Sequence, residues 1–228
     1  MNLPGSDSPC ALKEAVFGDI ATIARSLASP SRLLVLELIA QGEVHVERIA
    51  QATGLTVANT SQHLRALRQA GLIVRERDRQ FVYHRLASDG VVRLLASLHG
   101  LALQLSPALE TSLRAYRDRL GALEPVGAEE LLARSRADLV TIVDTRPETE
   151  YRLGHLHGAI NLPLAELDMR MGELAPGTEV VAYCRGGLCL LASEAVARMR
   201  AAGIAARRLE YGFPEWRAAG FPVDHPRQ

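Results

Sequence analysis

The chain has 228 residues, of which 48% are hydrophobic, and its 26 basic residues balance its 26 acidic residues. This length accommodates two small domains, each with an ordinary packed core. No apolar run is long enough to cross a bilayer, and residues 1–10 lack the basic start and apolar stretch of a secretory signal. Three cysteines are too few for a disulfide framework. We therefore expect a cytoplasmic protein with no membrane partner.

Charge is distributed unevenly along the chain. Residues 1–120 hold 14 basic and 11 acidic residues, a net charge of +3, whereas residues 121–228 hold 12 and 15, a net charge of −3. The stretch 56–85 contains six arginines against Glu76 and Asp78. Such a basic patch suits a surface that contacts phosphates, although charge alone favours an ordinary solvated face.

Helical periodicity and breaking residues divide the first 120 residues. The pattern predicts helices over 11–28, 31–41, 46–53, 57–70 and 88–105, and a last one that ends near 120. Residues 72–76 and 81–86 alternate apolar and polar side chains around the charged tip 77–79, which indicates a β-hairpin. The predicted fold class of this half is all-α with a β-wing, and residues 46–70 form a helix-turn-helix.

In the second helix of that motif, Thr60, Leu64 and Leu67 share the inward face. Its first turns then face outward, where such a helix enters a major groove. Asn and Gln pair with adenine, Arg pairs with guanine or phosphate, and the arginines of a wing reach the backbone or minor groove. His63 is more typical of a structural or phosphate-facing residue than of base readout. The candidate DNA-binding residues are Ala58, Asn59, Ser61, Gln62, His63, Arg65, Arg68, Arg77 and Arg79.

The actual residues of this half are more specific to one family than their periodicity is. The segments SPSRLLVLELIAQG and VERIAQATGLTVANTSQHLRALRQAGLIVRERDRQFVYHRL resemble the ArsR family of small dimeric repressors over roughly residues 15–100. The resemblance implies double-stranded operator DNA as a partner. It also implies a homodimer whose interface includes the helix 88–105 and the N-terminal helix.

Many members of that family sense metals, and here the sequence departs from them. Val44-His45-Val46 stands where some members carry a cysteine pair, and valine cannot ligate arsenic or cadmium. Asp89 and His99 remain on the dimer helix, but Val91 replaces a paired histidine. Two scattered ligands do not make a tetrahedral zinc site. We expect no metal site and no cofactor, and the input signal must come from elsewhere.

The second half has the alternation of an α/β domain. Residues 121–127 (GALEPVG) are predicted to be a linker, 128–136 and 193–202 helices, and 139–144, 179–183 and 206–209 strands. Alternation of strands and helices favours a mainly parallel sheet. The predicted domains are therefore 1–120, the linker 121–127, and 128–228.

Four ordered motifs carry a second resemblance. They are Val143–Tyr151, Gly154–Pro163, the loop Cys184–Cys189, and Tyr211–Trp216 followed by Gly220–Val223. Together they resemble a single rhodanese domain over about 125–228. The resemblance implies that Cys184 accepts sulfane sulfur as a persulfide. The predicted catalytic residues are Cys184, Arg185, Gly186, Gly187, Leu188, Cys189, Asp144 and Arg146.

Elementary chemistry supports Cys184 as the reactive residue. A strand that ends at a cysteine and leads through glycines into a helix can direct backbone N–H groups at the sulfur. The helix terminus and Arg185 are expected to lower the pKa of the Cys184 thiol, and Gly186 and Gly187 to supply unusual backbone conformations. Asp144 and Arg146 either form a structural ion pair or act directly in catalysis.

The loop also departs from the common rhodanese pattern. Many members end it with an Arg at the sixth position, where this chain has Cys189. The missing charge counts against efficient binding of thiosulfate. Cys189 is either a resolving thiol or a small buried residue at the start of a helix. Cys10 lies in the N-terminal tail and is interpreted as a non-functional surface thiol, with an intersubunit or sensing role as the alternative.

These features predict a transcriptional repressor that responds to sulfane sulfur or redox state through a persulfide on Cys184. The donor is thiosulfate, polysulfide or a persulfide. One alternative is a sulfurtransferase that uses DNA binding for autoregulation. Another is a repressor that responds to metal or arsenic, which the missing ligands disfavour.

Overall fold

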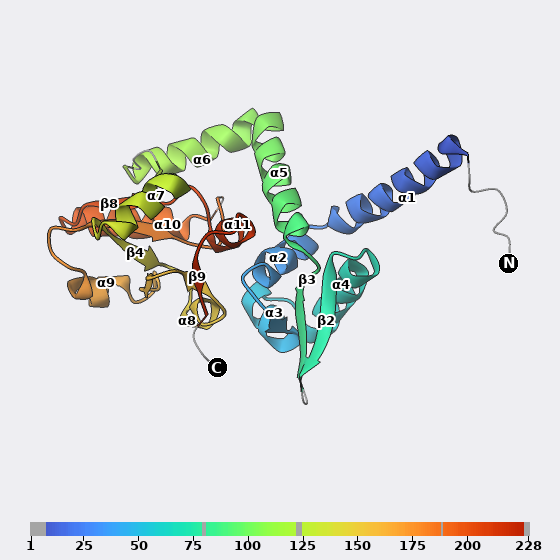
Figure 1. The fold of residues 1–228 in the computed structure, drawn as a ribbon, viewed down its shortest axis with the longest axis horizontal. Helices are drawn as coiled ribbons and strands as arrows, with labels where there is room; N and C mark the ends of the chain where they lie inside the picture. Colours follow the sequence, from blue (N-terminus) through green and yellow to red (C-terminus); the bar gives the residue numbers. More distant parts are fainter. Residues whose placement is uncertain (1–7, 79–80, 122–124, 188, 226–228) are drawn as a thin grey trace. The chain divides into compact units, whose positions relative to one another are not determined.

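The computed structural model describes residues 8–78, 81–121, 125–187 and 189–225. Contacts within the chain divide it into two compact units, residues 1–91 and 92–228 (Figure 1). The helix that follows the winged hairpin begins in the first unit and continues into the second.

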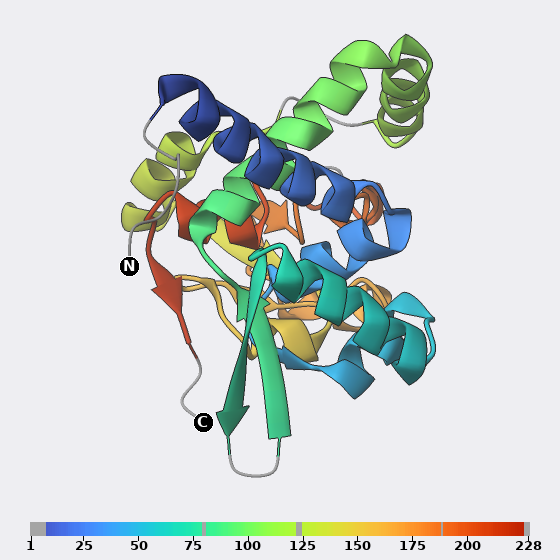
Figure 2. The same cartoon turned by 90° about the vertical axis from the view of Figure 1, so that its right-hand side faces the viewer.

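The first unit is a winged helix. Its elements are α1 (Pro9–Leu27), α2 (Pro30–Ile39), β1 (Val44–His45), α3 (Val46–Thr53), α4 (Val57–Gln69), β2 (Ile73–Asp78) and β3 (Phe81–Leu86). The three strands are antiparallel in the order β1-β3-β2, and Figure 2 shows α4 beside the long β2–β3 hairpin. Leu36, Ile49 and Leu67 are fully buried and join α2, α3 and α4 in one core.

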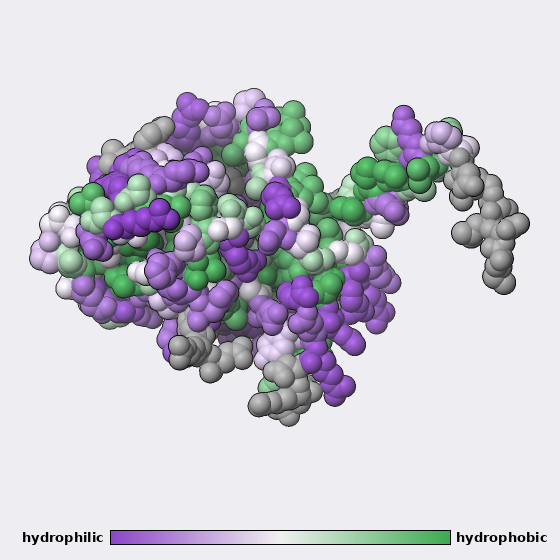
Figure 3. Space-filling model, viewed as in Figure 1, coloured by the Kyte–Doolittle hydropathy of each residue, from purple (hydrophilic) through white to green (hydrophobic). Residues whose placement is uncertain are grey.

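Helix α1 adds almost nothing to that core. Ser26 is its one buried residue. Leu12, Val16, Phe17 and Ile20 are each at least half exposed, and they form the hydrophobic surface along α1 in Figure 3. The apolar periodicity that predicts this helix is therefore not matched by a partner within the described chain.

The second unit contains most of α5 (Asp89–Leu105), then α6 (Pro107–Arg119) and an α/β domain. The elements of that domain are α7 (Ala128–Arg136), β4 (Val140–Asp144), α8 (Glu148–Tyr151), β5 (His155–Leu156), β6 (Ile160–Asn161), α9 (Leu167–Arg170), a 3-10 turn (Met171–Glu173), β7 (Glu179–Tyr183), α10 (Leu191–Ala201), β8 (Ala206–Arg208), α11 (Phe213–Ala218) and β9 (Val223–Asp224). The main sheet is parallel with the order β6-β4-β7-β8, and β5 pairs with β9 antiparallel.

Hydrophobic clusters cover both faces of this sheet. One contains Leu131, Leu156 and Trp216, and the other contains Val196 and Met199. Strands β4 and β7 run parallel and end side by side, with Asp144 paired to Tyr183. The site of a parallel sheet lies beyond the carboxyl ends of its strands, which here means the loop that begins at Cys184.

The fold class predicted from the sequence is confirmed: a winged helix-turn-helix precedes an α/β domain with a parallel sheet. Val126 falls within the expected linker, yet it is fully buried and bridges Leu209 in the parallel direction. Within the described ranges, no single helix is long and apolar enough to cross a bilayer. Helices α5 and α6 have the length and composition only when taken together, and they are bent by 100°.

Candidate functional site

The cysteine loop, residues 184–190, connects the end of β7 to the start of α10. Cys184 is 3% exposed, whereas Cys189 is only partly buried. The Cys184 thiol donates to the carbonyl oxygen of Cys189, with the sulfur 3.6 Å from that oxygen. The structure thus brings the two predicted cysteines together around one loop. Leu188, also predicted as a site residue, lies outside the described residues.

The two thiols differ in acidity, and the difference corrects the sequence-based expectation. Burial and the neighbouring Cys189 raise the pKa of Cys184 well above its ordinary value, and backbone hydrogen bonds from Ala192 and Gly186 offset this only in part. The hydrogen bond from Cys184 lowers the pKa of Cys189 to about 7. Cys189 is therefore the more acidic thiol of the pair, and the prediction of a lowered pKa at Cys184 is wrong.

Arg185 does not act as the free cation that the sequence suggests. Its guanidinium binds the buried carboxylate of Glu150 on α8, with Nη2 2.5 Å from Oε1. The charge of Arg185 lowers the pKa of Cys189 and is not among the causes that shift Cys184. Glu150 was not predicted as a site residue, because nothing in its local sequence pattern connects it to a loop 35 residues away.

Close approach between two segments, not an unusual backbone angle, accounts for Gly186 in the loop and for Gly212 opposite it. A Cβ on Gly212 would lie 2.2 Å from the amide nitrogen of Gly186, and one on Gly186 would lie 3.1 Å from a carboxylate oxygen of Glu215. Neither Gly186 nor Gly187 has a positive φ. The segment before α11 therefore rests directly on the cysteine loop, and Phe213 N donates to the carbonyl of Cys184 over 3.1 Å.

Asp144 and Arg146 form a closed ion pair beneath the loop. Both side chains are inaccessible to solvent, and Arg146 Nη2 lies 2.6 Å from Asp144 Oδ2. Arg146 also donates to the carbonyl of Gly154, and the Tyr183 hydroxyl donates to Asp144 over 2.6 Å. Neither residue can touch a sulfur donor in this arrangement, which favours the structural alternative for both.

The predicted DNA-binding face lies on the outer surface of α4. Thr56 caps the helix by accepting from the amide of Asn59, and Thr60, Leu64 and Leu67 are buried as predicted. His63 is partly buried. Arg79 lies outside the described residues. The exposed predicted residues are Ala58, Asn59, Ser61, Gln62, Arg65, Arg68 and Arg77.

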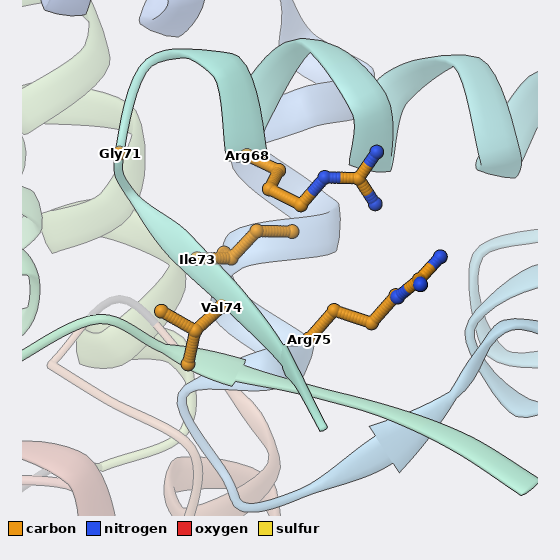
Figure 4. Close-up of a pocket in the computed structure, with 5 residues that line it drawn as sticks. All are labelled: Arg68, Gly71, Ile73, Val74 and Arg75. Atoms are coloured by element: carbon orange, nitrogen blue, oxygen red, sulfur yellow. The ribbon is translucent and has the colours of Figure 1, made fainter. Parts of the chain in front are cut away.

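A hollow between α4 and β2 adds a residue that the sequence argument missed. It is lined by Arg68, Gly71, Ile73, Val74 and Arg75, and the guanidinium groups of Arg68 and Arg75 extend from the two elements in the same direction (Figure 4). The ring of His84 is buried nearby, where desolvation and then the two arginine charges lower its pKa. The hollow is cationic and suits an anionic group such as a phosphate. The arginine-rich stretch 56–85 was the available signal for Arg75.

Asp89 lies in the first turn of α5, and His99 lies further along that helix. In the described parts of the chain, His, Cys, Asp and Glu side chains form no group of three or more that is placed to hold a metal ion.

Comparison with known proteins agrees with this geometry. Residues 29–74 match the family described as "Bacterial regulatory protein, arsR family", and residues 127–219 match the "Rhodanese-like domain". The chain is 43% identical over 213 residues to the HTH-type transcriptional regulator Rv0324 of Mycobacterium tuberculosis, with 93% of each chain covered. The chain belongs to the arsR family. It is a DNA-binding transcriptional regulator with a winged helix-turn-helix and a rhodanese-like domain.

Solved structures resemble each half of this arsR-family chain. A homodimeric winged helix-turn-helix fragment of Mb0332 from Mycobacterium bovis is 35% identical, covers 45% of this chain and 90% of its own, and has a TM-score of 0.39. A rhodanese-related protein from Thermoplasma volcanium is 24% identical, covers 45% of this chain and 98% of its own, and has a TM-score of 0.41.

Proposed function

We propose that this regulator is a homodimeric repressor whose affinity for operator DNA is set by sulfane sulfur carried on Cys184. The observation that carries the proposal is the Cys184 thiol hydrogen-bonded to the carbonyl of Cys189, in a loop where the two cysteines also shift each other's pKa. A sensor must chemically distinguish two states, and two adjacent thiols of different acidity do so without a metal.

The geometry suggests how sulfur is loaded. Cys189, with a pKa of about 7, accepts the proton of the Cys184 thiol, as suits a general base at neutral pH. The Cys184 sulfur attacks the outer sulfur of a persulfide donor R–S–SH. The donor S–S bond breaks, and R–S⁻ leaves and takes the proton from Cys189. The products are R–SH and a persulfide, Cys184–S–SH.

A second step closes the pair. The Cys189 thiolate attacks the Sγ atom of Cys184, the S–S bond of the persulfide breaks, and HS⁻ leaves. The two thiols are oxidised to a disulfide, and the sulfane sulfur is reduced to sulfide. Cys189 thus acts first as a base and then as the resolving thiol. In both the persulfide and the disulfide, the Sγ atom of Cys184 no longer carries a proton.

The N-terminal half provides the surface that binds operator DNA. The N-terminal turns of α4 expose Asn59, Gln62 and Arg65 for a major groove, and Arg68 and Arg75 extend from the hollow beside it. A dimer presents two faces to a pseudopalindromic operator, one helical turn or a multiple of it apart.

The dimer itself is proposed from unpartnered apolar surface. Leu12, Val16 and Ile20 on α1 are at least half exposed, and Leu101 and Leu105 on α5 are 48% and 75% exposed. Exposed apolar side chains gathered along a helix, as on each of these two, mark a protein interface. The covering partner is a second copy, because both helices flank the DNA-binding motif in the chain.

The test combines mass spectrometry with DNA binding. Purified protein is treated with polysulfide, the sulfur on each cysteine is determined, and operator affinity is measured on the same sample. We expect loading on Cys184, a Cys184–Cys189 disulfide as the end product, and about a tenfold change in affinity. Cys184→Ser abolishes both the loading and the change, Cys189→Ser loads more slowly and stops at the persulfide, and Cys10→Ser is the matched control. A Cys184→Ser protein that still responds contradicts the proposal.

A sulfurtransferase is the second candidate. The backbone donors from Gly186 and Ala192 favour it, because they stabilise a persulfide anion as well as a thiolate. Arg185 is occupied by Glu150, so binding of doubly charged thiosulfate is expected to be poor. Steady-state assays distinguish the candidates. Rapid turnover with a persulfide donor, lost in Cys184→Ser, indicates an enzyme, whereas stoichiometric loading indicates a sensor.

A further inference from the structure

Helix α6 has one half-buried face, and a charged residue lies in the middle of it. Leu113, Tyr116, Arg117 and Leu120 are partly buried and follow the i, i+3, i+4, i+7 spacing of one helical stripe, while most other positions of α6 are exposed. No residue of α6 is fully buried. The contact between α6 and the rest of its unit therefore buries little surface. A single polar group in that contact then has a large influence on whether the helix stays docked.

Arg117 reaches the cysteine loop. Its Nη2 atom donates to the carbonyl oxygen of Gly187 over 3.0 Å, although the two residues are 70 positions apart. Its Nε atom is buried and has no hydrogen-bond partner among the described residues. A buried polar atom without a partner costs free energy, and at this half-buried position the hydrogen bond to the Gly187 carbonyl offsets part of that cost. A second arginine, Arg200 of α10, donates to the carbonyl of Gly121 just beyond α6.

Gly187 lies between the two reactive cysteines. In the resting state, the Cys184 thiol closes the loop through its hydrogen bond to the Cys189 carbonyl. A persulfide or disulfide at Cys184 has no proton on Sγ, so that hydrogen bond is lost in either product. A disulfide would also fix the Cα atoms of residues 184 and 189 within about 4.4–6.8 Å, with Gly187 inside the closed ring. The carbonyl that Arg117 binds therefore belongs to the segment that sulfur chemistry rearranges.

We infer that Arg117 is a positioning residue of the cysteine loop, and that α6 is docked on this loop in the thiol state and released when Cys184 carries sulfur. The inference rests on the proposed function, because it names how the sulfur state leaves the rhodanese-like domain. The change reaches the DNA-binding half along the continuous polypeptide chain. Helix α6 follows α5 after a single residue, Ser106, and α5 follows β3 of the winged hairpin after two residues. A helix with docked and released positions is a two-state element that both sulfur and DNA can bias.

Three variants test it at equal sulfur occupancy, established by mass spectrometry. Arg117→Ala removes the contact, Arg117→Lys keeps a cation with a single donor group, and Arg114→Ala is the matched control. Arg114 lies on the same helix, is 71% exposed and pairs only with Glu110 in the described chain. Operator affinity is measured for the thiol and sulfur-loaded forms of each. Native protein and Arg114→Ala are expected to change affinity about tenfold, Arg117→Ala less than about twofold, and Arg117→Lys between them.

Hydrogen exchange supplies a readout that does not depend on DNA. Amides of residues 109–119 in the native full-length protein are expected to exchange faster after sulfur loading, and those of Arg117→Ala to exchange fast in both states. Thermal unfolding of Arg117→Ala against Arg114→Ala checks that the variant is folded. Equal responses of Arg117→Ala and Arg114→Ala, or identical α6 exchange in the two sulfur states, overturn the inference. Faster α6 exchange with no change in DNA affinity supports the docking of α6 and contradicts the proposed function instead.

Discussion

The two halves of the molecule use arginine in opposite ways. In the rhodanese-like domain, arginines are matched by carboxylates: Arg134 with Glu130 and Glu179, Arg146 with Asp144, Arg152 with Glu148, Arg170 with Glu166 and Glu173, Arg185 with Glu150, Arg198 with Asp168 and Glu194, and Arg207 with Glu130. In the winged helix, Arg65, Arg68 and Arg75 have no acidic partner among the described residues. The rhodanese-like domain pairs these arginines internally, whereas the winged helix keeps Arg65, Arg68 and Arg75 available for an external polyanion, although it pairs Arg85 with Glu76.

The largest effect is expected from breaking the most buried of these pairs. Arg146→Ala leaves the Asp144 carboxylate buried without its cation, which costs about 3–5 kcal/mol of unfolding free energy. Urea unfolding followed by the fluorescence of Trp216, the chain's one tryptophan, reports on this domain directly. Arg152→Ala, in an exposed i,i+4 pair with Glu148, is the control and is expected to change stability by less than about 0.5 kcal/mol. Equal losses in the two variants would remove the distinction between buried and exposed pairs.

The next effect concerns the unpaired arginines. Arg68→Ala and Arg75→Ala are each expected to weaken operator binding about tenfold at low salt, because each removes one of the proposed phosphate contacts. Each also lowers the slope of log affinity against log salt by about one. Arg85→Ala, which removes a cation already paired with Glu76 on the same hairpin, is the matched control. If Arg85→Ala matches the other two in affinity and slope, the contrast between paired and unpaired arginines does not determine DNA contact.

The smallest effect is a shift in the acidity of one thiol. In a Cys10→Ser background, the rate of Cys189 alkylation by iodoacetamide should rise with pH around a midpoint of about 7, because only the thiolate reacts. Cys184→Ala removes the hydrogen-bond donor that is the largest cause of the lowered pKa. The midpoint therefore moves to higher pH, and alkylation at pH 7 becomes slower. Peptide mapping by mass spectrometry assigns the rate to Cys189. A midpoint that stays in place would show that Arg185 and the backbone, not Cys184, set this acidity.

Local patterns predicted the scaffold well, and long-range packing explains what they missed. The inward positions of Thr60, Leu64 and Leu67 follow from spacing within one helix, and the structure confirms them. Glu150 meets Arg185, and Gly212 meets Gly186, only because the parallel sheet brings distant loops together. The prediction of which thiol is more acidic was wrong for a related reason. Sequence shows the neighbouring arginine and glycines, but the burial of Cys184 depends on the elements packed around it.

Helix α1 has a consequence for how the protein behaves on dilution. It spans 19 residues and buries one of them within the protomer. An isolated helix of that length is only marginally stable in water, since tertiary packing supplies most helical stability. If the second copy supplies that packing, the helicity of residues 9–27 becomes a property of concentration: a dilution series followed by circular dichroism should lose helix as dimers separate. Apparent stability would then rise with the number of molecules in the cell, which makes abundance itself a variable of the regulator.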